Sequence, residues 1–280
     1  SLEKATSMSG HMIPRPGVIR GSFVKKLCKV VTCCHRGVGR SEMNQEKNKT
    51  SSAAERDLQR IVFVPVIHTD AESAERVRRI VRETMPDVVA VELDRERYEI
   101  MMSGAQVQHD HPSSGDPVEA LMSQIAALEH TLGGHMGSDV GAEMMAAIEE
   151  GREIGAKIAL VDRPLRDTVQ ALMRVPLDEI YRLMGVIPET TEEIVSGDLD
   201  QHLDSLRSAE GVTELMTQFR EEFPGITRAL IDQRDEYVAR ALMTILGDVE
   251  GKIVVVLGAG HVEGVKRHLR RLLKQQGHAA

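Results

Sequence analysis

Four short apolar runs, separated by longer amphipathic segments, constrain the fold of this 280-residue chain more than any other feature of its sequence. Each run has the length of a buried strand and is rich in the β-branched residues that strands favour. Strands that alternate with helices are typical of α/β domains, so we expect a largely parallel central sheet, or a mixed one, flanked by helices. The runs are IVFVPVI (61–67), DVVAVEL (87–93), GAKIALVD (155–162) and KIVVVLGAGH (252–261).

The segments between these runs predict the helices that cover the sheet. Apolar residues recur at helical spacing after the first run, and Pro86 ends that pattern. Gly155 stands where a helix C-cap is expected, and a glycine turn is expected to lead from the last run into a terminal helix. Further helices are expected directly after Asp94, at 117–130, at 139–154 and, as a long helical insertion before the last run, over 164–246.

Charge and cysteine content divide the chain into two parts. Residues 1–50 carry 10 Lys and Arg against 3 Asp and Glu, whereas residues 51–280 carry 25 against 40. All three cysteines lie in the basic part, which suits an intracellular, reducing compartment for the rest. We predict a basic, disordered leader at 1–57, derived in part from an expression vector at SGHM, and a single α/β domain at 58–280. A membrane-surface or targeting segment is the alternative for the leader.

The acidic body argues against a nucleic-acid partner. Its charge repels phosphate, and a chain with no Trp, three Tyr and four Phe offers few platforms on which bases stack. Its apolar runs are far shorter than the roughly 20 residues that span a bilayer. We therefore expect a soluble domain, and its basic amphipathic C-terminal segment would also suit a position beside the membrane segments of a membrane-anchored protein.

Polar residues stand at or just beyond the carboxyl end of each apolar run. Because the carboxyl ends of parallel strands meet at one edge of a sheet, where ligands bind in such folds, we expect these side chains to converge. Imidazole nitrogen and carboxylate oxygen are donors for Zn²⁺ and similar first-row ions, and such an ion activates water for hydrolysis. The residues are His68, Glu92, Asp94, Asp162, Arg163 and His261.

These residues resemble the motifs of the TraB/PrgY family, named for pheromone-shutdown proteins and similar to Tiki-type metalloproteases. Its members carry a GxxH after a strand, a glutamate in a VELD-like run, an arginine in a DR pair and a second GxxH near the C-terminus. The second GxxH stands here as GAGH at 258–261, followed by VEGV, while the VELD run contains Glu92 and the DR pair contains Arg163. The stretches 141–163 and 230–242 also resemble the family, so the likeness covers nearly the whole body.

The resemblance implies a metal-dependent peptidase or hydrolase. His68, Glu92 and His261 would hold a divalent ion such as Zn, Mn or Co, and Glu92 and His261 would also take part in catalysis. Arg163, which cannot bind a metal, would hold the substrate carboxylate or the developing oxyanion. One position departs from the family pattern, because the first motif is PVIH and Pro65 replaces its glycine. Proline fixes φ, so the placement of His68 would change with it.

Further residues follow from the same resemblance. Arg234 and Tyr237, with Asp235 between them, lie in the stretch LIDQRDEYVARAL and would bind substrate. Asp94 and Asp162 would support the metal ligands through hydrogen bonds.

Each candidate also has a structural interpretation. His68 and His261 would be capping or core histidines, and Glu92 would form a salt bridge with a neighbour such as Arg163. Asp94, Asp162 and Arg234 would be helix caps or surface charges.

Two functions fit these residues. The first is a metal-dependent hydrolase, a peptidase that acts on or sequesters peptide signals. The second is a non-catalytic peptide-binding or membrane-associated scaffold protein that uses the same groove, and a homo-oligomer is compatible with either.

Overall fold

A four-stranded parallel sheet forms the centre of the computed structural model, which describes residues 53–66, 71–103, 115–136, 141–195 and 209–277. The strand order is β1-β4-β2-β3, and each neighbouring pair is parallel. The α/β prediction is therefore confirmed, and the described sheet is parallel rather than mixed. The strands are β1 (Ile61–Val66), β2 (Val88–Val91), β3 (Lys157–Leu160) and β4 (Ile253–Gly258).

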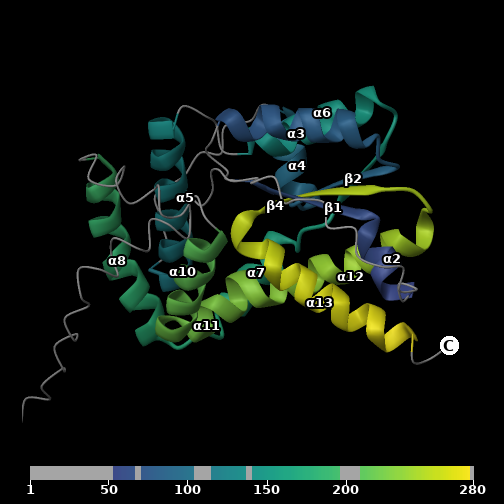
Figure 1. The fold of residues 1–280 in the computed structure, drawn as a ribbon. Helices are drawn as coiled ribbons and strands as arrows, with labels where there is room; N and C mark the ends of the chain where they lie inside the picture. Colours follow the sequence, from purple (N-terminus) through teal and green to yellow (C-terminus); the bar gives the residue numbers. More distant parts are fainter. Residues whose placement is uncertain (1–52, 67–70, 104–114, 137–140, 196–208, 278–280) are drawn as a thin grey trace, which may run out of the picture.

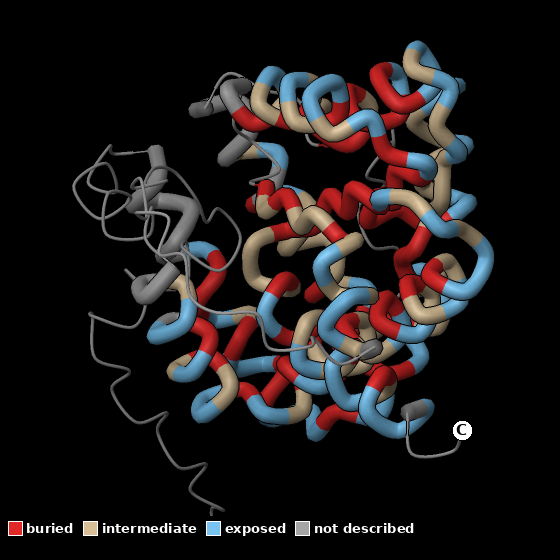
Figure 2. Tube along the Cα trace, turned by 45° about the vertical axis from the view of Figure 1, so that its right-hand side comes forward, coloured by how far each residue is buried: buried red, intermediate tan, exposed pale blue. Residues whose placement is uncertain are grey.

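Helices cover both faces of this sheet (Figure 1). Strand β4 lies inside the sheet, so its alternate side chains point into two different cores. Val254 and Val256 pack with one helical layer, while Val255 and Leu257 pack with the other, and all four are fully buried. This explains the uninterrupted apolar run, and Figure 2 shows the buried residues along the strands and the inward sides of the helices. The first layer contains α3 (Ala71–Thr84), α4 (Arg95–Ser103) and α6 (Ala142–Glu153); the second contains α2 (Ala53–Gln59), α12 (Gln233–Asp248) and α13 (Ala259–Gly277).

A separate group of helices packs beside the sheet around its own core. Leu121, Ile180, Phe223 and Ile226 are buried in that core. The predicted helical insertion before the last strand is confirmed over its described residues, and the helix at 117–136 packs with it. The group contains α5 (Pro117–Met136), α7 (Leu165–Leu172), α8 (Leu177–Val195), α10 (Ala209–Glu222), α11 (Pro224–Thr227) and the π-helix η2 (Arg228–Asp232).

Two glycine predictions have opposite outcomes. Gly155 follows the end of α6 with φ of 78°, and its N–H donates to Arg152 O at 3.1 Å, which confirms a left-handed helix end. The glycine turn after the last strand is wrong, because α13 begins at Ala259 directly after β4. Gly258 and Gly260 are not among the positive-φ residues of the described chain, so no left-handed turn separates strand from helix. His261 consequently lies in the first turn of α13.

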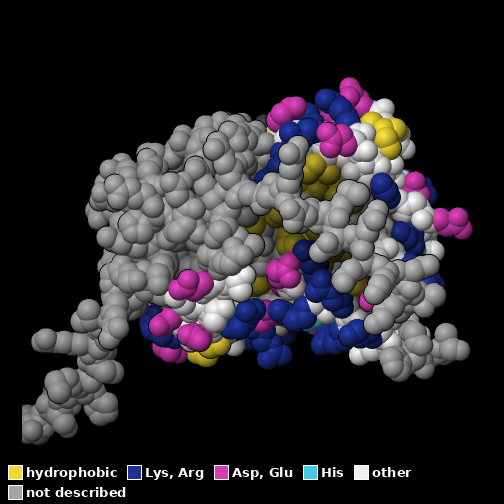
Figure 3. Space-filling model, viewed as in Figure 1, with side chains coloured by type: hydrophobic (Ala, Val, Ile, Leu, Met, Phe, Trp, Pro, Cys, Tyr) yellow, Lys and Arg dark blue, Asp and Glu magenta, His cyan; other side chains and the backbone are white. Residues whose placement is uncertain are grey.

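The terminal helix α13 is amphipathic, as its sequence predicts. Val265, Leu269 and Leu273 are buried, whereas Arg267 and Arg270 are exposed on the opposite side. Lys and Arg side chains group in the lower middle of Figure 3, over this helix. Among the described residues, no helix is both long and apolar enough to cross a membrane.

The predicted boundary of the leader lies within a helix. Helix α2 begins at Ala53 and ends at Gln59, so residues 53–57 are helical rather than part of a disordered leader. Residues 1–52 lie outside the described part of the chain.

Candidate functional site

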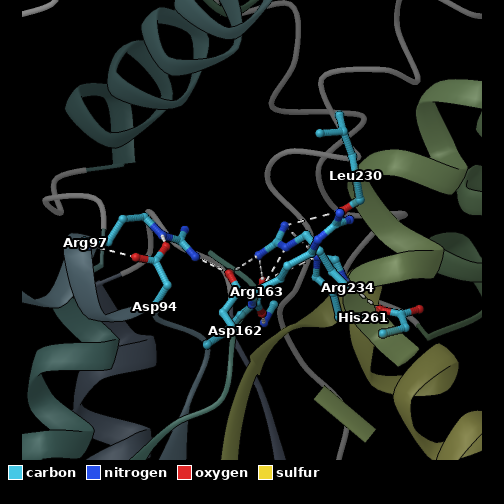
Figure 4. A network of polar contacts seen from close by, with 10 residues as sticks. Asp94, Arg97, Asp162, Arg163, Leu230, Arg234 and His261 are labelled. Atoms are coloured by element: carbon cyan, nitrogen blue, oxygen red, sulfur yellow. Dashed lines mark hydrogen bonds and ion pairs between the residues drawn. The ribbon is translucent and has the colours of Figure 1, made fainter. Parts of the chain in front are cut away.

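The carboxyl edge of the sheet collects most of the polar residues that the sequence predicts to converge. Backbone hydrogen bonds extend the pairing past the strand ends, because Glu92 N donates to Val256 O at 3.2 Å and Asp162 N donates to Leu93 O at 3.2 Å. Both carboxylates therefore leave the sheet at one edge, close to the start of α13. Figure 4 shows the polar network that forms there.

Glu92 follows β2 and its side chain is only 3% exposed. Its Oε2 accepts the backbone N–H of Gly258 at 2.7 Å, and its Oε1 accepts Nη2 of Arg234 at 2.5 Å. The same Oε1 lies 3.4 Å from Nε2 of His261. A buried carboxylate is costly unless it is paired, and these contacts offset that cost. The predicted alternative partner, Arg163, is not the arginine that pairs with Glu92.

Arg234 on α12 joins the two buried carboxylates. It binds Asp162 through two parallel hydrogen bonds, Nε to Oδ1 at 3.0 Å and Nη2 to Oδ2 at 2.7 Å, in addition to its bond to Glu92. Burial lowers the pKa of Arg234, but Glu92 and Asp162 raise it by more, so the net shift is upward and the guanidinium stays charged. Arg234 was predicted to bind substrate, and in the structure it is the centre of the ion-pair network.

The π-helix η2 directly precedes the residues that reach this centre. Gln233, Arg234 and Asp235 follow it in sequence. Gln233 binds Arg163, Arg234 binds both buried carboxylates, and Asp235 binds His261. Successive side chains on a regular helix point about 100° apart, so three consecutive residues do not normally all face the same site. The widened turn shifts the helical register just before these residues, and such turns often occur at functional sites. No local sequence signal predicted it.

Nδ1 of His261 faces an acceptor, whereas Nε2 faces both a donor and Oε1 of Glu92, an acceptor that is 3.4 Å away. Its Nδ1 lies 2.7 Å from Oδ1 of Asp235, and its Nε2 lies 3.4 Å from Nη1 of Arg234. A carboxylate only accepts, so the shorter contact, 2.7 Å from Nδ1 to Asp235, assigns the proton of the neutral imidazole to Nδ1. Nε2 then keeps a lone pair that accepts from Arg234. Burial, the largest effect, lowers the pKa of His261, but Glu92 and Asp235 raise it by more, and the net shift is upward.

Arg163 is bound by neutral oxygens. Its Nη1 donates to Oε1 of Gln233 at 2.7 Å and its Nη2 donates to the backbone oxygen of Asp167 at 2.6 Å. Its backbone N–H donates to Oδ1 of Asp162 at 2.7 Å. Within the described residues its guanidinium therefore makes no hydrogen bond to a carboxylate, and it differs in this respect from Arg97 and Arg234.

Asp94 and Arg97 extend the network away from His261. Asp94 Oδ1 accepts the backbone N–H groups of Glu96 at 2.9 Å and Arg97 at 3.1 Å, so it caps α4. Its Oδ2 accepts Nε of Arg97 at 2.8 Å, and Arg97 Nη2 in turn binds Oδ2 of Asp162. Asp94 is thus both a helix cap and an indirect neighbour of Asp162. The sequence interpretation missed Arg97, although its place one turn after an N-cap aspartate in DRER was a usable signal.

Three predicted positions have a different status. The side chain of Tyr237 is 43% exposed on α12, and no hydrogen bond within the described residues connects it to the network. His68 belongs to the segment 67–70, which is outside the described residues, so its role as a metal ligand stays a prediction. Pro65 lies within β1 at the edge of the described sheet, where one side of the strand has no partner among the described residues and proline is tolerated.

Two of these donors have the spacing that ligands of a divalent ion require. Two ligands that are each about 2.1 Å from a tetrahedral ion lie roughly 3.4 Å apart, and His261 Nε2 and Glu92 Oε1 have this separation of 3.4 Å. An imidazole whose other nitrogen is bound by a carboxylate, as here by Asp235, is the usual form of a metal ligand. No three His, Cys, Asp or Glu side chains among the described residues are placed to hold an ion, so a complete set needs His68 or another residue outside them.

The charge balance of the network favours an additional cation. Among the described residues, four carboxylates meet two guanidinium groups, so these side chains carry two net negative charges when His261 is neutral. A proton on His261 or a bound metal ion would reduce this negative charge, which agrees with the upward shift of the pKa of His261. The carboxylates are Glu92, Asp94, Asp162 and Asp235, and the guanidinium groups belong to Arg97 and Arg234.

Comparison with known proteins identifies the family of this chain. The model of the TraB/PrgY/gumN family matches residues 53–280, which is most of the sequence. The chain belongs to the TraB/PrgY/gumN family. The resemblance inferred from the VELD, DR and GAGH motifs is therefore confirmed, and these TraB motifs supply Glu92, Arg163 and His261 to one edge of the sheet.

Relatives of this TraB chain occur in archaea and mammals. An uncharacterized protein of Methanocaldococcus jannaschii is 30% identical over 217 residues, which cover 76% of this chain and 54% of the relative. A TraB domain-containing protein of Homo sapiens is 23% identical over 258 residues, which cover 82% of this chain and 67% of the relative. That of Bos taurus is 25% identical over 262 residues with the same coverage. The chain thus spans about half the length of the archaeal relative and about two thirds of the mammalian ones.

Proposed function

We propose that this chain is a metal-dependent hydrolase that acts on peptides. The observation that carries the proposal is the 3.4 Å separation of His261 Nε2 and Glu92 Oε1, with Nδ1 of His261 fixed by Asp235. A divalent ion held by these two residues and His68 would polarise a carbonyl and lower the pKa of water toward neutrality. TraB family membership supports the proposal, since Glu92 and His261 lie in family motifs.

Arg163 would bind the part of the substrate that is or becomes negative. Its guanidinium is oriented by Gln233 and by the backbone of Asp167, which are neutral acceptors, and no carboxylate of the described residues binds it. A preorganised cation of this kind stabilises the charge that develops on a carbonyl oxygen when the peptide bond is attacked. It would equally hold a substrate carboxylate.

Glu92 and Arg234 would set the charge at the centre. Glu92 Oε1, which faces His261, would bind the ion, and a nearby carboxylate would accept a proton from the attacking water and return it to the leaving amine. Arg234 keeps its bidentate pair with Asp162, whether or not its bond to Glu92 persists. The pair therefore anchors α12 against the sheet while Glu92 changes partner.

Metal content decides the proposal. The purified chain is loaded with Zn²⁺, Mn²⁺ or Co²⁺, desalted and measured by inductively coupled plasma mass spectrometry, and a peptide library is scored for cleavage. We expect about one ion per chain in the wild type and in His130→Ala, an exposed histidine on α5, with loss of the ion and of cleavage in His261→Ala. A wild type that holds no stoichiometric ion under any loading condition overturns the metal-dependent mechanism.

One observation favours the second function, a non-catalytic peptide-binding or scaffold protein. Arg234 Nη2 lies 2.5 Å from the Glu92 oxygen that faces His261, so the carboxylate is neutralised without a metal. A site of this kind would hold a peptide carboxylate on Arg163 without cleaving it. Binding of library peptides that needs Arg163 and persists in chelator, together with the absence of cleavage, would support this function instead.

A further inference from the structure

Gly264 on α13 lies directly against the carboxylate of Asp235 on α12. A Cβ atom at position 264 would lie 1.7 Å from Oδ2 of Asp235, 2.6 Å from its Cγ and 3.3 Å from its Cβ. Atoms that are not bonded to each other do not come within 1.7 Å, so the carboxylate occupies the volume that the side chain of any other residue at position 264 would fill. Gly264 is one helical turn after His261, whose Nδ1 binds the other oxygen of the same carboxylate at 2.7 Å.

Neither Asp235 nor the helices have room to adjust. The side chain of Asp235 is 2% exposed, and it has only two rotatable bonds. A rotation that moved Oδ2 away from a new methyl group would also move Oδ1 away from His261. Separation of the helices would open a packed core, because Val238 and Leu242 of α12 are buried with Val265 of α13 against the sheet.

Local helix propensity does not explain this glycine. Alanine is favoured over glycine inside a helix, so a glycine in the second turn of α13 weakens the helix unless its lack of a side chain is used. Gly247 on α12 provides the contrast, since a Cβ there would meet nothing within 4 Å.

We propose that Gly264 is a positioning residue for His261. Its missing side chain creates the space in which the Asp235 carboxylate sits. That carboxylate holds the proton of the imidazole on Nδ1, so that the lone pair of Nε2 faces Nη1 of Arg234. The VEGV sequence after GAGH thereby acquires a physical reason for its glycine. The inference depends on the proposed function only where it concerns metal affinity.

The test is a double-substitution cycle between Gly264→Ala and Asp235→Ala, with Gly247→Ala as the matched control. Long-range ¹H–¹⁵N spectra report the imidazole tautomer, and the His261 signals are assigned by their loss in His261→Gln. In metal-free protein we expect the Nδ1–H form in the wild type and in Gly247→Ala. We expect a mixture of tautomers in Gly264→Ala, in Asp235→Ala and in the double variant, with no further change in the double variant.

If Gly264→Ala alone fails to fold, the folding of the double variant still tests the inference. In that case Asp235→Ala, which removes the clashing atoms, should restore folding to Gly264→Ala. A Gly264→Ala protein with the wild-type tautomer overturns the inference, as does a double variant in which the two losses of stability add.

Metal affinity separates this inference from the proposed function. If the wild type binds an ion, Gly264→Ala should weaken Zn²⁺ or Co²⁺ binding by about 10–100-fold, while Gly247→Ala leaves it unchanged. Unchanged affinity in Gly264→Ala contradicts the inference. If the wild type binds no ion, the proposed hydrolase fails, and the tautomer cycle still decides the role of Gly264.

Discussion

The backbone N–H of Gly258 donates to Oε2 of Glu92 at 2.7 Å and so ties the last residue of β4 to the residue that follows β2. The bond uses one carboxylate oxygen and leaves the other directed at Arg234 and His261. Glu92 therefore fixes the junction between sheet and α13, and it also belongs to the candidate site.

Loss of the Glu92 carboxylate should destabilise the fold strongly. Glu92→Ala leaves Arg234 with one buried carboxylate partner fewer, and breaking such a buried pair costs about 3–5 kcal/mol in the free energy of unfolding. Glu92→Gln keeps an oxygen for Gly258 and should lose less. The control is Glu236→Ala, whose exposed pairs with Arg240 on the same helix and with Arg271 on α13 are each worth less than about 1 kcal/mol. Urea unfolding measures both, and equal losses would contradict the central role of Glu92.

Arginine at position 234 should not be replaceable by lysine. A lysine ammonium cannot form the two parallel bonds to Asp162 and reach Glu92 at the same time. We expect Arg234→Lys to lower the free energy of unfolding by about 1.5–3 kcal/mol, the range for hydrogen bonds to charged groups. Arg240→Lys, with a single exposed bond to Glu236, should change little. If thermal unfolding of the two variants agreed, the bidentate geometry would have no energetic importance.

The contribution of His261 to stability should depend on pH with a defined sign. The pKa of His261 is raised in the folded chain, because Glu92 and Asp235 outweigh the lowering effects of burial and Arg234. A group with a raised folded pKa stabilises fully below its unfolded pKa, about 6.5, and this contribution is lost as pH rises through the folded value. In chelator, the difference in unfolding free energy between wild type and His261→Gln should therefore grow as pH falls from above the folded pKa to about 6.

The matched control for this measurement is His130→Gln on the exposed side of α5. Subtracting its pH profile removes any general effect of losing an imidazole. A difference between wild type and His261→Gln that stays constant or shrinks toward low pH is the contrary outcome.

The sequence predicted the features that depend on residues close together in the chain, such as the strands. The apolar runs locate all four strands of the described sheet, and parallel topology then brings Glu92, Asp162 and His261 to one edge. The central role of Arg234 could not be predicted in this way, since its partner Glu92 is 142 residues away and the contact depends on how α12 packs. The π-helix at 228–232, directly before Gln233 and Arg234, was likewise not predicted.

The left-handed end of α6 permits a test of the local rules alone. Gly155 has φ of 78°, and a Cβ there would meet nothing within 4 Å, so the cost of Gly155→Ala is confined to the backbone. We expect this substitution to lower the free energy of unfolding by about 1–2 kcal/mol, the cost of placing an L-residue in the left-handed region. Gly247→Ala, in the ordinary helical conformation on α12, should instead raise it by about 0.5–1 kcal/mol. Chemical denaturation of both variants should thus give shifts of opposite sign, and a stabilising Gly155→Ala would show that the left-handed helix end is not needed at this position.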